Sequence, residues 1–183
     1  MKFLKNLLTT IIIVIILLII GRWYLGWFST PTATEKPMGP YLVAYVHFTW
    51  AYDKVWPVMT KLYDALSGAG ITAFTGIGIY YDAPGSVTGN MLNSDVGAVI
   101  APADSNKLDK KSADYKIQTI TRSTKVVVEF PYRNSFSYMV GPIKVYPVMT
   151  AYMKEKGYNL ETPRIELYDL TAKKIYYMAD VIK

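Results

Sequence analysis

A repeated heptapeptide is the feature that most limits how this chain can fold. Residues 54–60 read KVWPVMT and residues 144–150 read KVYPVMT, so the two segments differ by one aromatic residue. Each segment opens a run of apolar residues at the three- and four-residue spacing of an amphipathic helix. The first run ends near Gly68 or Gly70 and the second near Gly157, where glycine can provide a left-handed C-cap. We interpret the match as a tandem duplication.

Apolar and alternating segments suited to β-strands surround both predicted helices. The strand candidates, in chain order, are 42–50, 76–80, 95–101, 125–130, 135–140, 164–168 and 174–182. We place 135–140 directly before the second helix and interpret 125–130 as an extra strand that leads into the second unit. The expected fold is α+β, with a strand-helix-strand-strand unit at about 41–102 and again at about 125–183. Two such units side by side form an antiparallel sheet with two long helices packed on one face.

The N-terminus has the composition of a membrane-spanning helix. Residues 7–20 are apolar and uncharged, and continuing to residue 28 gives a helix of about 33 Å at 1.5 Å per residue, enough to cross a bilayer. The aromatic residues at its end are typical of an interfacial belt, namely Trp23, Tyr24, Trp27 and Phe28. We therefore expect a single-pass anchor at 1–28 that contacts the membrane through 7–28, a linker at 29–40 and one domain at 41–183.

Two features of this segment leave alternatives open. A cleaved signal peptide has a similar apolar core, but no small-residue cleavage pattern follows the run, so we favour an uncleaved anchor. Lys2 and Lys5 outnumber Arg22, which by the positive-inside rule places the N-terminus in the cytoplasm and the domain outside. This charge difference is small, and the reverse orientation stays an alternative.

Composition excludes several classes of site. The chain has no cysteine and a single histidine, His47, so thiolate and multi-histidine metal sites are impossible, and we expect neither a metal nor a cofactor. We expect His47 to be a surface residue or one whose hydrogen bonds are satisfied. The net charge of +6 is concentrated in the first 36 residues and in a probable loop at 107–125. Because no whole face is basic, nucleic acid is not an expected partner.

Alternation in the strand at 164–168 predicts a ligand site. Side chains of a strand point alternately to opposite faces, so Glu166 and Tyr168 share one face while Ile165 and Leu167 share the other, which we expect to meet the helices. The same parity in the first unit places Gly78 and Tyr80 beside Glu166. A carboxylate among tyrosines with a glycine floor suits a flat, aromatic or cationic molecule. The alternative is an exposed ion pair of Glu166 with Arg164 or with a lysine.

Four further aromatic residues are candidate walls of this pocket. Trp50 and Tyr138 lie near the ends of the two strands that we place before the helices, and Trp56 and Tyr146 are the residues that differ in the repeat. Core packing explains each of them equally well.

The duplication, the strings IGIYYD and IELYD, and the pair Gly141-Pro142 resemble the GyrI-like small-molecule-binding family. This family includes the effector-binding domains of AraC-type regulators. The resemblance covers about 41–183. It implies that two units join about a pseudo-twofold axis and that a glutamate in an E-x-Y strand points into a central pocket, the position of Glu166 with Tyr168.

Three functions follow as hypotheses. The first is binding of small amphipathic or cationic organic ligands at the membrane surface, with Glu166 selecting charge. The second, which the resemblance implies, is hydrolysis of reactive cyclopropanoid-type toxins, with Glu166 as the base and Tyr80 or Tyr168 as its helper. The third is a protein-interaction module at the membrane. Since the first 40 residues are interpreted as anchor and linker and no helix-turn-helix is apparent, direct control of transcription is not expected.

Overall fold

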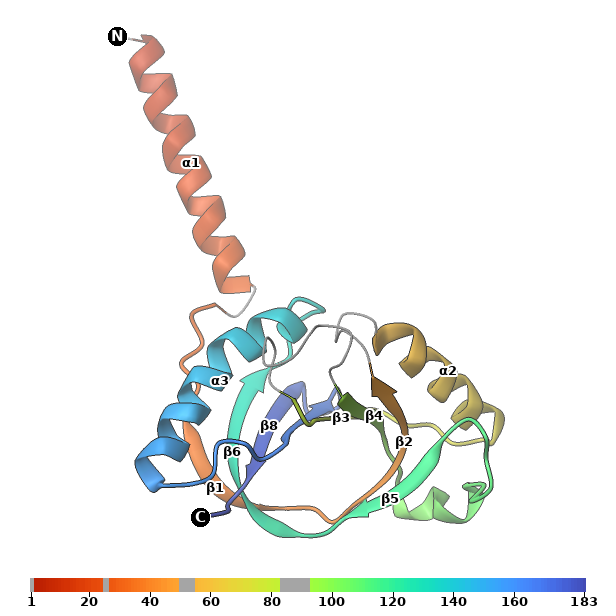
Figure 1. Ribbon diagram of the computed structural model, residues 1–183. Helices are drawn as coiled ribbons and strands as arrows, with labels where there is room; N and C mark the ends of the chain where they lie inside the picture. The colour runs from red at the N-terminus through yellow and green to blue at the C-terminus, as the bar shows by residue number, and fades with distance from the viewer. Residues whose placement is uncertain (1, 25–26, 50–54, 83–92) are drawn as a thin grey trace.

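A long N-terminal helix rises from an α+β domain in the computed structural model of the protein, which describes residues 2–24, 27–49, 55–82 and 93–183. Helix α1 (Lys2–Tyr24) has no buried residue and is long and apolar enough to cross a membrane, a test that an N-terminal signal sequence also passes. The remaining elements form one curled antiparallel sheet with two long helices (Figure 1). The α+β class and the apolar helix therefore agree with the sequence analysis.

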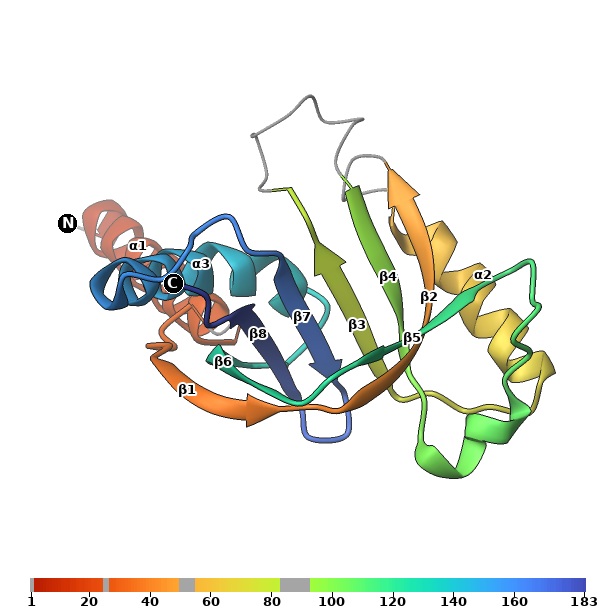
Figure 2. The same cartoon turned by 60° about the horizontal axis from the view of Figure 1, so that its bottom comes forward.

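The sheet has eight strands in the order β1-β6-β8-β7-β3-β4-β2-β5, with β7 and β3 in its middle (Figure 2). Each half of the chain runs strand, strand, helix, strand, strand, and the first strand of each half pairs with the second strand of the other half. The strand order is thus symmetrical about the β7–β3 pair, while descent by duplication stays a prediction. The strands are β1 (Ala33–Met38), β2 (Tyr41–Thr49), β3 (Thr75–Tyr80), β4 (Asn93–Val99), β5 (Lys116–Ile120), β6 (Ser123–Pro131), β7 (Arg164–Asp169) and β8 (Lys174–Asp180).

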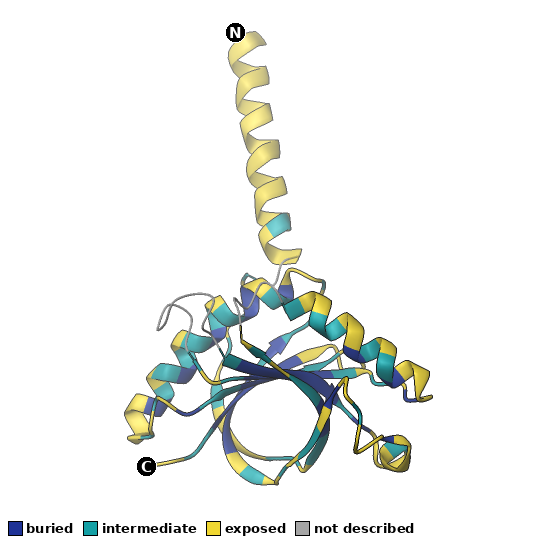
Figure 3. Ribbon diagram, turned by 45° about the vertical axis from the view of Figure 1, so that its right-hand side comes forward, coloured by how far each residue is buried: buried dark blue, intermediate teal, exposed yellow. Residues whose placement is uncertain are grey.

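Both helices of the domain pack on the same face of the sheet, near its two sides (Figures 1 and 3). Leu62 and Leu66 of α2 (Val55–Gly68) pack against β2 and β4. Val145 and Met149 of α3 (Ser137–Lys156) pack against β6 and β8. A strip of sheet over β7 and β3 is left between the two helices.

The C-terminal end of α3 is where the glycine pattern predicts it. Gly157 has a φ of 69° and follows the last helical residue, and the Tyr158 backbone N–H donates to the Met153 carbonyl at 2.9 Å. A residue without Cβ adopts this left-handed conformation at little cost, which ends the helix.

The start of α3 corrects one prediction. Residues 135–140 were expected to form a strand, but α3 begins at Ser137 and contains Pro142 in its interior. The strand that precedes this helix is β6, which we had interpreted as an extra strand. Packing explains the outcome, because Ser137, Val140 and Gly141 are buried by the domain and so stabilise two additional turns of helix despite the proline.

The predicted linker also contains structure. Its residues 33–38 form β1, which pairs antiparallel with β6 from Ala33–Val128 to Met38–Ser123. Pro37 lacks an N–H but is tolerated here because β1 is an edge strand. The segment that joins α1 to the domain is therefore part of the sheet.

A second correction concerns the faces of the sheet. Ile165, Leu167, Ile77 and Ile79 were expected to meet the helices, but they pack together with Val127 and other strand residues on the opposite face. The sheet curls on itself, so this concave face is buried as well (Figure 1). Glu166 and its neighbours consequently lie on the face that carries α2 and α3.

Candidate ligand-binding site

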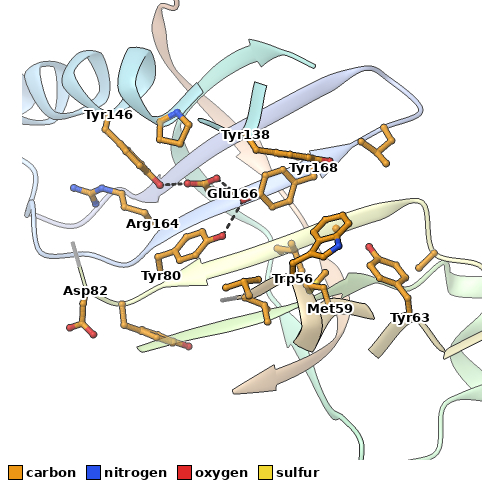
Figure 4. A pocket seen from close by; sticks show the side chains of 18 of the residues that line it. Trp56, Met59, Tyr63, Tyr80, Asp82, Tyr138, Tyr146, Arg164, Glu166 and Tyr168 are labelled. Carbon is orange, nitrogen blue, oxygen red and sulfur yellow. Dashed lines mark hydrogen bonds between the residues drawn. The ribbon is translucent and has the colours of Figure 1, made fainter. Parts of the chain in front are cut away.

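A pocket of about 1250 Å³ lies between α2 and α3, above the strip of β3 and β7 that neither helix covers. Figure 4 shows side chains from both helices and both strands converging on it. Its lining is largely apolar and aromatic, with a small number of polar groups, which is the usual composition of sites for small organic molecules. The aromatic lining residues are Trp56, Tyr63, Phe74, Tyr80, Tyr81, Tyr138, Tyr146 and Tyr168.

Glu166 is the buried acid of this pocket, with a relative exposure of 6%. The Tyr146 hydroxyl donates to Glu166 Oε1, and the Tyr168 hydroxyl donates to Glu166 Oε2 at 2.6 Å. The hydroxyls of Tyr80 and Tyr168 lie 3.1 Å apart, which extends the network across to β3 (Figure 4). One carboxylate and three tyrosines from α3, β7 and β3 are thus held in a single chain of hydrogen bonds.

Burial controls the protonation of this network. It raises the pKa of Glu166, and the hydrogen bonds from Tyr146 and Tyr168 act in the opposite direction but are the weaker causes. Burial and the charge of Glu166 raise the pKa of both tyrosines well above the ordinary value of 10.0. Both hydroxyls therefore keep their protons at neutral pH and act as donors to the carboxylate.

The alternative of an exposed ion pair is wrong. The Arg164 guanidinium donates to the carbonyl oxygens of Leu160 at 2.8 Å and Thr162 at 2.7 Å, and it is partly buried in the pocket wall. Within residues 2–24, 27–49, 55–82 and 93–183, no basic side chain forms an ion pair with Glu166. Among the described side chains, the hydrogen-bond partners of Glu166 are the hydroxyls of Tyr146 and Tyr168, which stabilise its charge.

Gly78 has a different place from the one expected. It pairs with Glu166 across β3 and β7, and a Cβ there would lie 2.7 Å from the ring of Tyr80. The glycine therefore makes room for Tyr80 to lie over the strand, and it supports the pocket without lining it.

The other predicted residues are distributed as follows. Trp56, Tyr80, Tyr138, Tyr146, Glu166 and Tyr168 all line the pocket, and Trp50 lies outside the described residues. The ring of Tyr138 packs edge-on against that of Tyr168 with centroids 5.3 Å apart. Sequence reasoning missed the hydroxyl of Tyr146 as a partner of Glu166, although the repeat marked its position, and it also missed Met59 and Tyr63, which α2 turns toward the pocket at the spacing of one helical turn.

The charged residues of the lining are mostly acidic. Arg164 is the one basic residue among those described, and the acidic ones are Asp64, Asp82, Glu161 and Glu166. The excess of negative charge favours cations over anions in the pocket.

His47 has a partner of its own on the concave side of the sheet. Its Nδ1 lies 2.7 Å from Asp95 Oδ1, and the Tyr81 hydroxyl donates to Asp95 Oδ2 at 2.7 Å. The expectation of a satisfied histidine is confirmed. In the part of the chain that the structure describes, no group of three or more acidic or histidine side chains is placed to hold a metal ion.

Comparison with solved structures identifies relatives of the fold. No family of known sequences and no curated protein matches this chain. The crystal structure of the EcmrR C-terminal domain superposes with a TM-score of 0.63 at 13% identity, over 85% of this chain and 99% of that chain. EcmrR in its cryo-EM complex with DNA gives 0.62 at 13%, over 98% and 69% of the two chains. An uncharacterized conserved protein from Listeria innocua gives 0.55 at 10%, over 81% and 91%. At these identities the likeness establishes a shared fold and nothing further.

Proposed function

We propose that this protein binds small amphipathic or cationic organic molecules in the pocket between α2 and α3. The observation that carries the proposal is Glu166, an acid buried among aromatic rings, with tyrosine hydroxyls as its only described partners. A buried carboxylate without a counter-ion gains most from a ligand that brings a positive charge. The fold shared with the EcmrR C-terminal domain supports a GyrI-like architecture, in which two duplicated units enclose one site.

The aromatic walls and the acid have separate roles in this proposal. The rings of Trp56, Tyr138 and Tyr168 provide flat apolar surface and attract cations through their faces, whereas Glu166 selects charge. Neutral aromatic compounds should therefore bind through the walls alone, and aromatic cations should bind more tightly.

The test compares tetraphenylphosphonium, an aromatic cation, with neutral triphenylphosphine oxide by titration calorimetry of the full chain in mild detergent at pH 8. Glu166→Gln should weaken binding of the cation by about ten- to hundredfold and leave the neutral compound within about twofold, because only the charge is removed. Glu161→Gln is the matched control, since it removes an exposed acid of the same lining. Equal affinity of the natural chain and Glu166→Gln for the cation would contradict charge selection.

Hydrolysis of reactive cyclopropanoid-type molecules is the alternative that the raised pKa of Glu166 favours, because burial makes this carboxylate a stronger base than an exposed one. Both carboxylate oxygens already accept a tyrosine hydrogen bond, which favours the binding function. Product formation from such electrophiles that disappears in Glu166→Gln would reverse this preference.

Membrane anchoring by α1 is the second part of the proposal, with the N-terminus in the cytoplasm and the domain outside. Its support is a 23-residue helix that is long and apolar enough to cross a bilayer and has no buried residue. An anchored chain stays with membranes after washing in alkaline carbonate and keeps its N-terminus. A soluble chain that begins after residue 28 would instead identify a cleaved signal sequence.

A further inference from the structure

Two basic side chains near the start of α3 hydrogen-bond to backbone carbonyls at and just after the end of α1. The Arg133 guanidinium donates to the Trp23 carbonyl at 2.7 Å, and the Lys144 ammonium donates to the Trp27 carbonyl at 2.8 Å. The guanidinium of Arg133 also lies 5.2 Å from the centre of the Trp23 ring. The start of α3 therefore lies beside the aromatic residues Trp23 and Trp27.

The N-cap residue of α3 and the first two turns of this helix expose three large apolar side chains. Phe136, Met139 and Ile143 are 57%, 66% and 61% exposed, and their spacing of three and four residues puts them on one side of the helix. We call these three residues the outer α3 stripe. It lies opposite the buried side of α3, which includes Gly141 and Val145, so it points away from the sheet.

The outer α3 stripe and the pocket lie on the same side of the sheet. Helix α1 leaves the domain on the side of the sheet that carries α2 and α3 (Figures 1 and 3). Pro142 and Tyr146 of α3, which lie next to the stripe on the helix surface, line the pocket. Trp56 of α2 also lines it, and 72% of the surface of this residue is exposed. Apolar side chains of α2 and α3 thus border the pocket on the side of the sheet from which α1 leaves the domain.

We propose that this border rests in the interface of a phospholipid bilayer, so that the pocket opens toward lipid and takes its ligands from the membrane. The inference rests on the anchoring and binding proposed above. An apolar helix face at an interface sinks about 5–10 Å to the level where headgroups meet acyl chains, and Arg133 and Lys144 flank the stripe as basic residues do beside phosphates. Continuity with the anchor makes lipid the occupant of this surface. Compounds that concentrate in membranes, such as hydrophobic cations, are the ligand class that this opening admits.

The absence of cysteine allows a direct test with single labels on the full chain in phosphatidylcholine vesicles. Met139→Cys and Ile143→Cys each carry a bimane label, whose fluorescence should be quenched by lipids with nitroxide-labelled acyl chains. Aqueous iodide should quench these labels several-fold less than a label at the control position. Ile182→Cys, an exposed apolar position near the C-terminus, is the matched control and should behave in the opposite way. Ile13→Cys, in the middle of α1, reports insertion of the anchor.

The outcomes separate this inference from the proposed function. Quenching by lipid at residue 13 but free access of iodide at residues 139 and 143 would overturn the lipid contact while anchoring stands. No quenching by lipid at residue 13 would overturn both. Protection from iodide at residues 139 and 143 without quenching by lipid would assign the surface to a second copy of the chain, which also overturns the inference.

Ligand entry is tested with Met139→Asp combined with Ile143→Asp, and Ile182→Asp serves as the control. The double variant should bind tetraphenylphosphonium normally in detergent and should lose several-fold in apparent affinity when the cation is supplied in vesicles. Equal affinity in vesicles would overturn entry from the membrane. Failure of the natural chain to bind the cation in detergent would overturn the proposed function instead.

Discussion

The two halves of the domain have the same order of helix and strands but contribute different side chains to the pocket. In the second half, Tyr146 of the repeated heptapeptide donates to Glu166 on the neighbouring strand. In the first half, Trp56 has the corresponding place in the repeat, and Gly78 is the residue that β3 pairs with Glu166. One half therefore supplies an acid with its donor, and the other supplies an indole and a glycine that makes room for Tyr80. This difference predicts that a ligand with a charged end and an aromatic end binds in one orientation only.

In both halves a tyrosine side chain packs over a glycine. Substitution of that glycine should have the larger effect on stability in the second half. A Cβ at Gly141 would lie 2.1 Å from the Tyr177 hydroxyl, in the buried contact between α3 and β8. Gly141→Ala should lower the free energy of unfolding by about 1–3 kcal/mol, because overpacking a core forces neighbours out of position. Chemical denaturation measures the effect, and Gly68→Ala in α2, where a Cβ meets nothing within 4 Å, is the control.

Gly78→Ala should cost less than Gly141→Ala, since the ring of Tyr80 is only partly buried and can swing toward the pocket. An equal loss of stability in the two variants would show that the halves are constrained alike.

Glu166 should make the stability of the protein depend on pH. Burial raises the pKa of Glu166 above the ordinary value of 4.5, so its contribution to stability is complete below the unfolded pKa and is lost as the pH rises through the folded pKa. The natural chain should lose stability relative to Glu166→Gln as the pH rises from 4 to 8. Glu161→Gln should not change the slope, and a constant difference between natural chain and Glu166→Gln would contradict the raised pKa.

The aromatic half should contribute to every ligand by a smaller amount. Trp56→Ala removes one exposed ring face and should weaken both tetraphenylphosphonium and triphenylphosphine oxide by about fivefold, the equivalent of about 1 kcal/mol. Because Trp56 is largely exposed, stability should change by less than about 0.5 kcal/mol. Trp56→Phe retains a ring and should recover most of the affinity in calorimetry. Weakening of the cation alone would mean that Trp56 acts with Glu166 and not as a general wall.

The smallest effect is expected when the residue that differs between the two heptapeptide copies is replaced by phenylalanine in each copy. Tyr146→Phe removes a hydrogen bond that lowers the pKa of Glu166, so the pH midpoint of cation binding should move upward. At a pH above both midpoints the affinity should change by only about twofold, since the Tyr168 hydroxyl still donates to the carboxylate. Trp56→Phe is the matched change in the other copy and should leave the pH midpoint of cation binding unchanged. Equal midpoints in the natural chain and both variants would show that Tyr146 does not affect the pKa of Glu166.

The sequence was sufficient to bring Glu166, Tyr168 and Tyr80 to one face, because alternation depends only on the strand and not on its surroundings. It did not reveal which face the helices cover. Apolar residues such as Ile165 and Leu167 are expected to meet helices only when the other face is solvated, and here the curled sheet buries both faces.

Local pattern failed where partners distant in the chain decide the structure. The segment 135–140 is short and apolar, which suits either a strand or a helix, and contacts with β6 and β8 select the helix. The 33–38 segment contains a proline and little that could pack by itself, and it becomes β1 only through β6. The position of Tyr146 above Glu166 likewise depends on how α3 lies on the sheet.

The pairing of β1 with β6 has a consequence for synthesis of the chain. Residues 33–38 emerge from the ribosome directly after the apolar helix, yet their partners at 123–128 are made only after the whole first half has been translated. Until then this strand has no place in a sheet, and contacts so distant in the chain slow folding. A nascent chain that stalls before residue 123 would carry an unpaired strand beside its apolar helix, and such a strand is a site for aggregation or for chaperones.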